Sequence, residues 1–174
     1  MLSHETKSPT EDIKKILPLL DSIPILAGLS EVNLFQILQR LKRVSYAAGE
    51  TIFKEGDCAS YIYIIETGRV KLIFSHESFT LTKAELLPGS CFGETSVIGI
   101  QPHSATTVAM EDSDLLILSG DVLAELFNQD KELFSILILN IARESCRRLY
   151  TTNKQLVEYL SLNVDSADAD IQDY

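Results

Sequence analysis

Short apolar runs separated by turn residues dominate the middle of the chain, from Val44 to Leu118. Turn signals such as Thr67-Gly68 and Pro88-Gly89 interrupt these runs at short intervals. The runs are rich in β-branched and aromatic residues, which favour strands. They comprise residues 51–53, 61–65, 70–74 and 115–118. Short strands at such even spacing predict a β-sandwich or jelly roll.

Helical periodicity flanks this region on both sides. Before it, Thr10 and Ser30 are candidate N-caps of two helices whose apolar residues recur every three or four positions. After it, a short helix is expected to begin at Ser119, and a long helix is expected over about residues 131–162. The predicted fold class is therefore mainly β with flanking helices, namely N-terminal helices, a barrel and a long C-terminal helix.

The long helix changes character along its length. Its first part is apolar nearly all round, which predicts packing on the barrel. Its second part carries a narrow stripe at alternating spacings of three and four, formed by Ala142, Ser145, Leu149, Thr152, Leu156 and Tyr159. Such a seam is typical of a coiled coil. We expect a parallel homodimer through this helix, and packing of the seam on another part of the same chain is the alternative.

These patterns divide the chain into four segments. Residues 1–9 are expected to form a flexible arm, and residues 10–128 the N-terminal helices and the barrel. The long helix takes residues 129–162, and residues 163–174 form an acidic tail. The aspartates of the tail lack the glycine and the terminal glutamate of a calcium-binding loop. A flexible, solvated tail is therefore predicted.

Composition and charge disfavour several classes of function. The chain has 174 residues, enough for one domain with a core, and its net charge of -10 is unfavourable for contacts with nucleic-acid phosphates. No apolar run is as long as a membrane span, and the N-terminus lacks a signal-peptide pattern. The three cysteines are widely spaced and predict neither a disulfide framework nor a metal site. We expect a cytoplasmic protein that neither enters a membrane nor binds DNA directly.

Catalytic chemistry is not predicted. The three histidines, His4, His76 and His103, are scattered, which disfavours a metalloenzyme of the jelly-roll type. Cys146 has no histidine near it in the sequence to act as its base. We therefore expect no catalytic residues, no metal and no cofactor.

One stretch between predicted strands does carry candidate binding chemistry. Gly93 permits close approach of the backbone, and Glu94 is a carboxylate placed where an apolar strand ends. Residues 95–98 predict a single helical turn, whose N-terminal N–H groups suit an anion. Ser104 adds a hydroxyl within about a dozen residues. Backbone donors, a carboxylate acceptor and a hydroxyl together predict a site for a sugar phosphate.

The order Phe92-Gly93-Glu94 followed by His103-Ser104-Ala105 resembles the phosphate-binding cassette of cyclic nucleotide-binding domains, as in the catabolite activator family. The resemblance extends over about residues 25–163. It implies a double-stranded β-helix (jelly-roll) barrel that binds cAMP or cGMP. It also implies that the base of the nucleotide contacts the long helix.

Site residues are carried over from this resemblance by position. Glu94 would accept a hydrogen bond from the ribose 2′-hydroxyl, although a carboxylate there also suits the capping of the helical turn. Ser104 would donate to the phosphate. Thr152 would contact the base, and since it also lies in the seam, a purely interfacial role stays open. The implied ligand-binding residues are Phe92, Gly93, Glu94, Thr95, Ser96, His103, Ser104, Ala105, Arg148, Thr152 and Asn153.

His103 departs from the family pattern, which has arginine at this position. Losing a buried charge-assisted contact costs about 2–5 kcal/mol, which is about thirty-fold to several-thousand-fold in affinity. Three interpretations stay open. His103 protonates when the ligand binds, Lys83 supplies the missing charge, or the pocket no longer binds cyclic nucleotides. A solvent-facing role on its strand is the alternative for Lys83.

Two functions follow as expectations. The first is a stand-alone regulatory sensor that couples binding of a cyclic nucleotide to movement of the long helix and to an unidentified protein partner. Because the chain ends soon after this helix, we expect no recognition helix for DNA. The second is a ligand-free version of the same fold that serves as a dimerisation or protein-interaction scaffold.

Overall fold

The computed structural model of the protein describes residues 22–76 and 79–169, without the side chains of residues 76–84 and 162–169. The predicted arm, the predicted helix after Thr10 and the last residues of the tail lie outside the described residues. The chain divides into two compact units between Ile141 and Ala142.

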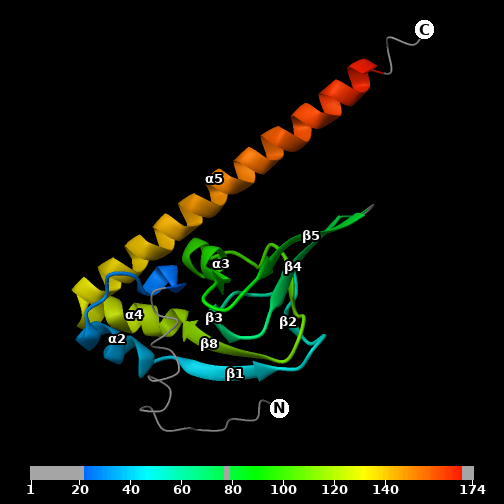
Figure 1. Cartoon of the computed structure of the whole chain (residues 1–174). Helices are drawn as coiled ribbons and strands as arrows, with labels where there is room; N and C mark the ends of the chain where they lie inside the picture. Colours follow the sequence, from blue (N-terminus) through cyan, green and yellow to red (C-terminus); the bar gives the residue numbers. More distant parts are fainter. Residues whose placement is uncertain (1–21, 77–78, 170–174) are drawn as a thin grey trace. The chain divides into compact units, whose positions relative to one another are not determined.

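Two antiparallel four-stranded sheets make up the β region of the first unit (Figure 1). Sheet A has the order β1-β8-β3-β6, and sheet B has the order β2-β7-β4-β5. Neighbours such as β1 and β8 are distant in sequence, as in a jelly roll, so the predicted fold class is confirmed. The strands are β1 (Lys42–Tyr46), β2 (Thr51–Phe53), β3 (Tyr61–Thr67), β4 (Val70–His76), β5 (Phe79–Leu86), β6 (Cys91–Phe92), β7 (Thr106–Ala109) and β8 (Ser113–Ser119).

The helices begin where the sequence places capping residues. The Oγ atom of Ser30 accepts from the N–H of Asn33 at 3.2 Å, and Oγ of Ser119 accepts from the N–H of Val122 at 3.2 Å. The helical elements are η2 (Pro24–Leu26), α2 (Glu31–Leu38), α3 (Glu94–Gly99), α4 (Gly120–Gln129) and α5 (Lys131–Ala169). Helix α5 continues past the expected end near residue 162, so the first part of the predicted flexible tail is helical.

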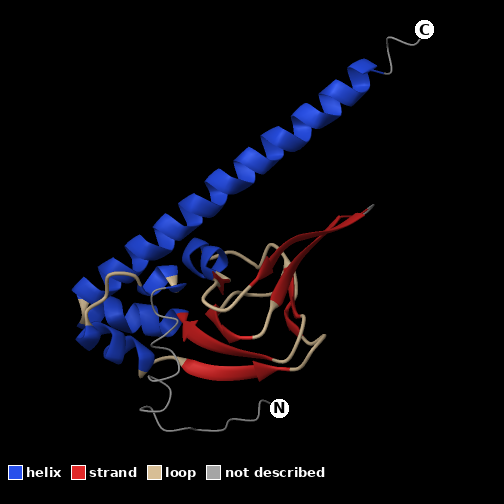
Figure 2. Cartoon of the chain, in the orientation of Figure 1, coloured by secondary structure: helices blue, strands red, loops and turns tan. Residues whose placement is uncertain are grey.

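Strand β3 of sheet A is buried on both of its faces. Ile62 and Ile64 of β3 belong to a core shared with the helices, whereas Tyr63 and Ile65 belong to a second core shared with sheet B. Figure 2 shows the helices α2 and α4 gathered on one side of the sheets. A strand buried on both faces has no polar positions to alternate with. This explains why β3 is apolar throughout residues 61–65.

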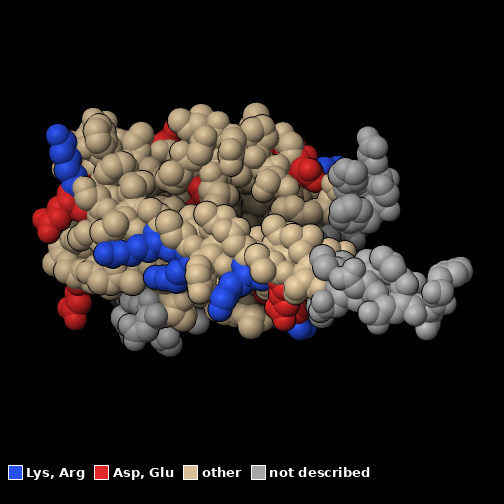
Figure 3. Space-filling model, turned by 90° about the horizontal axis from the view of Figure 1, so that it is seen from above, with Lys and Arg blue, Asp and Glu red and all other residues tan. Residues whose placement is uncertain are grey.

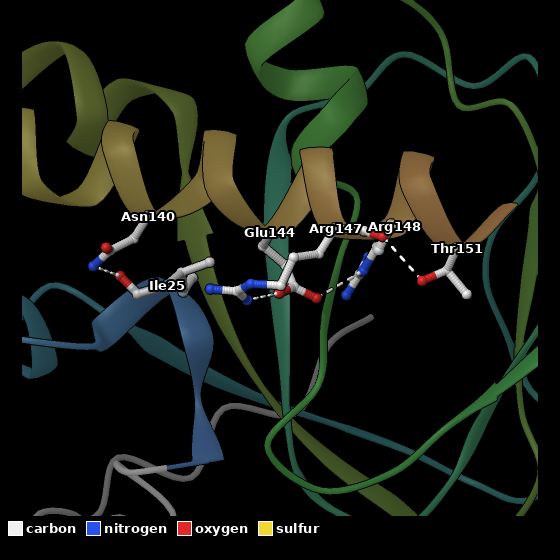
Figure 4. Close-up of polar contacts among 6 residues, drawn as sticks. All are labelled: Ile25, Asn140, Glu144, Arg147, Arg148 and Thr151. Carbon is white, nitrogen blue, oxygen red and sulfur yellow. Dashed lines mark hydrogen bonds and ion pairs between the residues drawn. The ribbon is translucent and has the colours of Figure 1, made fainter. Parts of the chain in front are cut away.

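The first part of α5 packs in the core of the first unit, as predicted. Leu133, Leu137 and Ile141 are buried there, and the buried Asn140 lies between them. The Nδ2 atom of Asn140 donates to the backbone oxygens of Ile25 at 3.3 Å and Ala27 at 2.7 Å; Figure 4 shows the contact with Ile25. These bonds satisfy carbonyls at the end of η2 and fix this helix against the N-terminal segment.

An ion pair links β1 to β3 across sheet A. The Arg43 guanidinium donates to both carboxylate oxygens of Glu66, from Nε at 2.6 Å and from Nη2 at 2.7 Å. The side chain of Glu66 is 5% exposed and that of Arg43 is 20% exposed.

Among the described residues, no helix has the length and apolar character needed to cross a bilayer.

Candidate functional site

The segment predicted to bind a sugar phosphate folds as a strand, a short helix and a loop between β6 and β7. Strand β6 pairs with β3, and α3 follows β6 directly after Gly93. Phe92 is buried in the core between the sheets, which anchors the start of the segment. The predicted helical turn at residues 95–98 is therefore present within α3.

Gly93 allows the turn from β6 into α3. Its φ of 82° lies in the left-handed region, where side chains are strained. A Cβ at this position would lie 2.8 Å from the backbone oxygen of Tyr61, closer than real Cβ contacts allow. The close approach predicted for this glycine is thus made to strand β3.

Glu94 is the first residue of α3 and is 1% exposed. A carboxylate is rarely buried without hydrogen bonds, because burial removes its water. Glu94 does have an interaction within the protein, but its buried Oε2 atom makes no hydrogen bond within the described part of the chain. The position combines a carboxylate with the N–H groups of the first helical turn, which have no intrahelical acceptor.

The other residues of the segment divide by exposure. Ser96 and Ala105 are buried, whereas Thr95 and Ser104 are exposed. The hydroxyl of Ser104 is accessible to a ligand.

His103 is turned into the barrel. Its side chain stacks on the ring of Phe53 in β2, with centroids 3.6 Å apart and planes at 9°. Its Cε1 would lie 3.6 Å from a Cβ placed on Gly93. The backbone N–H of His103 donates to the backbone oxygen of Asp57 at 2.9 Å. The backbone oxygen of His103 accepts from the N–H of Gly56 at 2.8 Å. The imidazole thus belongs to an aromatic cluster that also contains Tyr63.

Burial lowers the pKa of His103 below its ordinary value, and the negative charge of Asp57 opposes this shift only in part. The imidazole is therefore uncharged at neutral pH. An uncharged ring with one N–H donor gives a phosphate much less stabilisation than an arginine does. The first interpretation of His103, protonation on ligand binding, requires the ligand to reverse this shift.

Acid is expected to destabilise the fold through His103. Since the pKa in the folded chain lies below the unfolded value of about 6.5, the unfolded chain binds the extra proton first as pH falls. The contribution of His103 to the free energy of unfolding is therefore constant above about pH 6.5 and decreases below that pH. Urea denaturation at about pH 7.5 and about pH 5.5 measures the effect.

The variant His103→Phe is the control for this prediction, because it keeps the stack on Phe53 and removes the titrating group. The pH-dependent loss should be smaller in the variant than in the wild type. Equal losses in the two proteins would show that His103 does not contribute.

Ile100 marks the loop after α3 as strained, which the sequence did not indicate. This β-branched residue has a φ of 50° and is 94% exposed. Left-handed backbone is unfavourable for such residues and is enriched at functional sites. A glycine or asparagine would have signalled this conformation, but isoleucine does not.

The remaining predicted residues lie elsewhere. Lys83 is in β5, and its side chain lies outside the described residues. Arg148, Thr152 and Asn153 lie on α5 in the second unit, and their part in the site stays a prediction. Within that unit, Glu144 forms ion pairs with Arg147 and Arg148 (Figure 4).

Most of the face drawn in Figure 3 is uncharged, and several basic side chains lie close together in a row along its lower half. On α5, Glu144 pairs with both Arg147 and Arg148, so these two arginines belong to a salt-bridged helix face. Within the described residues, no three His, Cys, Asp or Glu side chains are grouped to hold a metal ion.

Comparison with known proteins gives a family match that contains residues 92–105. The family model described as cyclic nucleotide-binding domain matches residues 43–130, just over half of the chain. The cyclic AMP receptor protein of Thermus thermophilus is 35% identical over 96 residues, which are 55% of this chain and 44% of that protein. This chain therefore matches less than half the length of that curated relative.

Solved structures have the same fold. The catabolite activator protein of Thermus thermophilus superposes with a TM-score of 0.69 at 30% identity, over 76% of this chain and 61% of that one. A cyclic nucleotide-binding domain from Methylobacillus flagellatus superposes with a TM-score of 0.79 at 22% identity, over 90% of this chain and 88% of that one.

Proposed function

This chain belongs to the cyclic nucleotide-binding domain family, and on that premise we propose that it is a regulatory module that binds cAMP or cGMP at residues 92–105. The observation that carries the proposal is the match over residues 43–130, which contains this whole segment. Glu94 lies within the matched region, and its buried carboxylate at the start of α3 supports the proposal. The module is proposed to act without catalysis.

Each group of the segment has a proposed role. Glu94 accepts from the ribose 2′-hydroxyl, and the N–H groups of Thr95 and Ser96 face the phosphate. Ser104 donates to the phosphate through its exposed hydroxyl. The close backbone approach at Gly93 supports this arrangement, since a larger residue would displace α3 from β3.

Helix α5 is proposed to carry the signal. Arg148, Thr152 and Asn153 would contact the base while residues 92–105 hold the ribose phosphate. The ligand would then favour the helix positions in which both contacts form, and it would shift the population only by its difference in affinity. A separate cytoplasmic protein would detect the change.

Isothermal titration with cAMP and cGMP tests this function. Wild-type protein should bind at least one of them, and Glu94→Gln should weaken binding at least about tenfold, because a hydrogen bond to a charged acceptor is lost. Glu125→Gln, on the exposed surface of α4, is the matched control and should bind as wild type. Thermal unfolding monitored by circular dichroism checks that Glu94→Gln is folded.

A ligand-free scaffold is the second candidate function, and the position of His103 favours it. The imidazole packs on Phe53 and is uncharged at neutral pH, so it offers no counter-charge to a phosphate. Absence of binding heat for both nucleotides in the wild type, with clear binding after His103→Arg, would establish this alternative.

Homodimerisation through α5 is proposed for either function. Leu149 and Leu156 are 61% and 53% exposed, so the predicted seam presents apolar side chains that a second copy would cover. Leu149→Asp should convert a dimer to a monomer in sedimentation equilibrium, because a charge would be buried in the seam.

Val157→Asp is the control for this prediction, since Val157 is also exposed but lies off the seam. It should leave the dimer intact. A monomeric wild type, or equal disruption by both substitutions, would contradict a seam formed by these residues.

A further inference from the structure

Thr107 is a polar residue in the interior of the barrel. It lies in β7 and is 0% exposed. Its Oγ1 atom is buried and makes no hydrogen bond within the described part of the chain. Buried hydroxyls are nearly always hydrogen-bonded, so such an atom requires a physical explanation.

The strand register places Thr107 next to the aromatic cluster. It is directly opposite Phe53 on β2 and directly opposite Leu72 on β4. Directly opposite residues of an antiparallel pair point to the same face. The ring of Phe53 points into the barrel, since it stacks on His103 and lies 5.5 Å, centroid to centroid, from Tyr63. The Thr107 side chain therefore enters the same interior.

Thr107 is also close in sequence to the proposed site. It follows the exposed Ser104 by three positions and the buried Ala105 by two. The adjacent Thr106 provides a contrast, because its Oγ1 accepts from the N–H of Glu55 at 3.1 Å. Valine has the same shape as threonine and suits a buried strand without leaving a hydroxyl unsatisfied. Packing alone therefore does not explain a threonine at position 107.

We propose that Thr107 is a specificity-determining residue whose hydroxyl contacts a polar atom of the ligand from inside the barrel. The proposal rests on the proposed function, since the hydroxyl would contact the same ligand that is proposed to bind at residues 92–105. A hydroxyl both donates and accepts, so it can serve a ribose hydroxyl or a phosphate oxygen of a cyclic nucleotide.

The test compares Thr107→Val with Thr107→Ser, using titration with cAMP and cGMP and thermal unfolding without ligand. Thr107→Val should bind about ten- to a hundredfold more weakly, because the ligand loses a hydrogen bond. Without ligand, the same variant should melt at the wild-type temperature or about 2–4 °C above it, because an unsatisfied hydroxyl is removed. Thr107→Ser retains the hydroxyl and should keep its affinity within a few-fold of wild type.

Thr106→Val is the matched control and should show the opposite pattern. It loses a hydrogen bond that the fold uses, so its melting temperature should fall while its affinity stays unchanged.

Equal binding by wild type and Thr107→Val overturns the inference and leaves the proposed function standing. A melting temperature of Thr107→Val clearly below that of wild type also overturns it, since the hydroxyl would then serve the fold. Absence of binding of either nucleotide to the wild type overturns the proposed function, and this inference with it.

Discussion

His103→Arg is expected to bind cAMP or cGMP at least about thirty times more tightly than the wild-type chain. The gain corresponds to about 2–5 kcal/mol, the typical effect of one buried charge-assisted contact. The physical reason is that arginine keeps its charge at any physiological pH and grips a phosphate with two parallel N–H donors. The wild-type imidazole is buried and uncharged at neutral pH. Isothermal titration of the two proteins measures the difference.

The gain in affinity should be accompanied by a loss of stability. The substitution removes the stack of the imidazole on Phe53, at a cost of about 0.5–1.5 kcal/mol. His103→Gln is the matched control, since it removes the stack without adding charge, and it should not gain affinity. Equal affinities of the arginine and glutamine variants would refute the role assigned to charge at this position.

Glu66→Ala is expected to have the largest effect on stability, a loss of about 3 kcal/mol in the free energy of unfolding. The substitution leaves the guanidinium of Arg43 without the carboxylate that accepts two of its N–H groups. Glu66 is only 5% exposed, so water replaces this contact poorly. Chemical denaturation at neutral pH measures the loss.

Two further variants separate this effect from the loss of charge alone. Glu111→Ala breaks the exposed pair with Arg69, whose side chains are 46% and 45% exposed, and should have a much smaller effect. The double variant Arg43→Met/Glu66→Leu removes both charges and should recover most of the stability. A Glu66→Ala variant as stable as Glu111→Ala would contradict the prediction.

The elements of the fold were largely predictable, because each depends on residues close together in sequence. Ser30 and Ser119 cap helices where they were expected, since a cap needs only an N–H about three residues ahead. The apolar run at residues 61–65 gave β3 for the same reason. The close backbone approach at Gly93 was also expected, because glycine has no side chain.

The end of α5 and the conformation of Ile100 were not predictable in this way. The acidic composition after residue 162 suggested a flexible tail, whereas the helix continues to Ala169. Helix ends are set by weak propensities that context changes readily. The left-handed Ile100 opposes its own local preference, so only the surrounding loop explains it.

The sequence by itself determined the types of the elements, their order and the segment that is proposed to bind the ligand. Only the tertiary structure decided that His103 faces Phe53, that Glu66 pairs with Arg43, and that the buried Thr107 hydroxyl has no hydrogen-bond partner among the described residues. The physical reason is that periodicity shows which face of an element is apolar, but not which distant strand lies against it. Arg43 and Glu66 are 23 positions apart, and Phe53 and His103 are 50 positions apart, so both contacts depend on strand order and register.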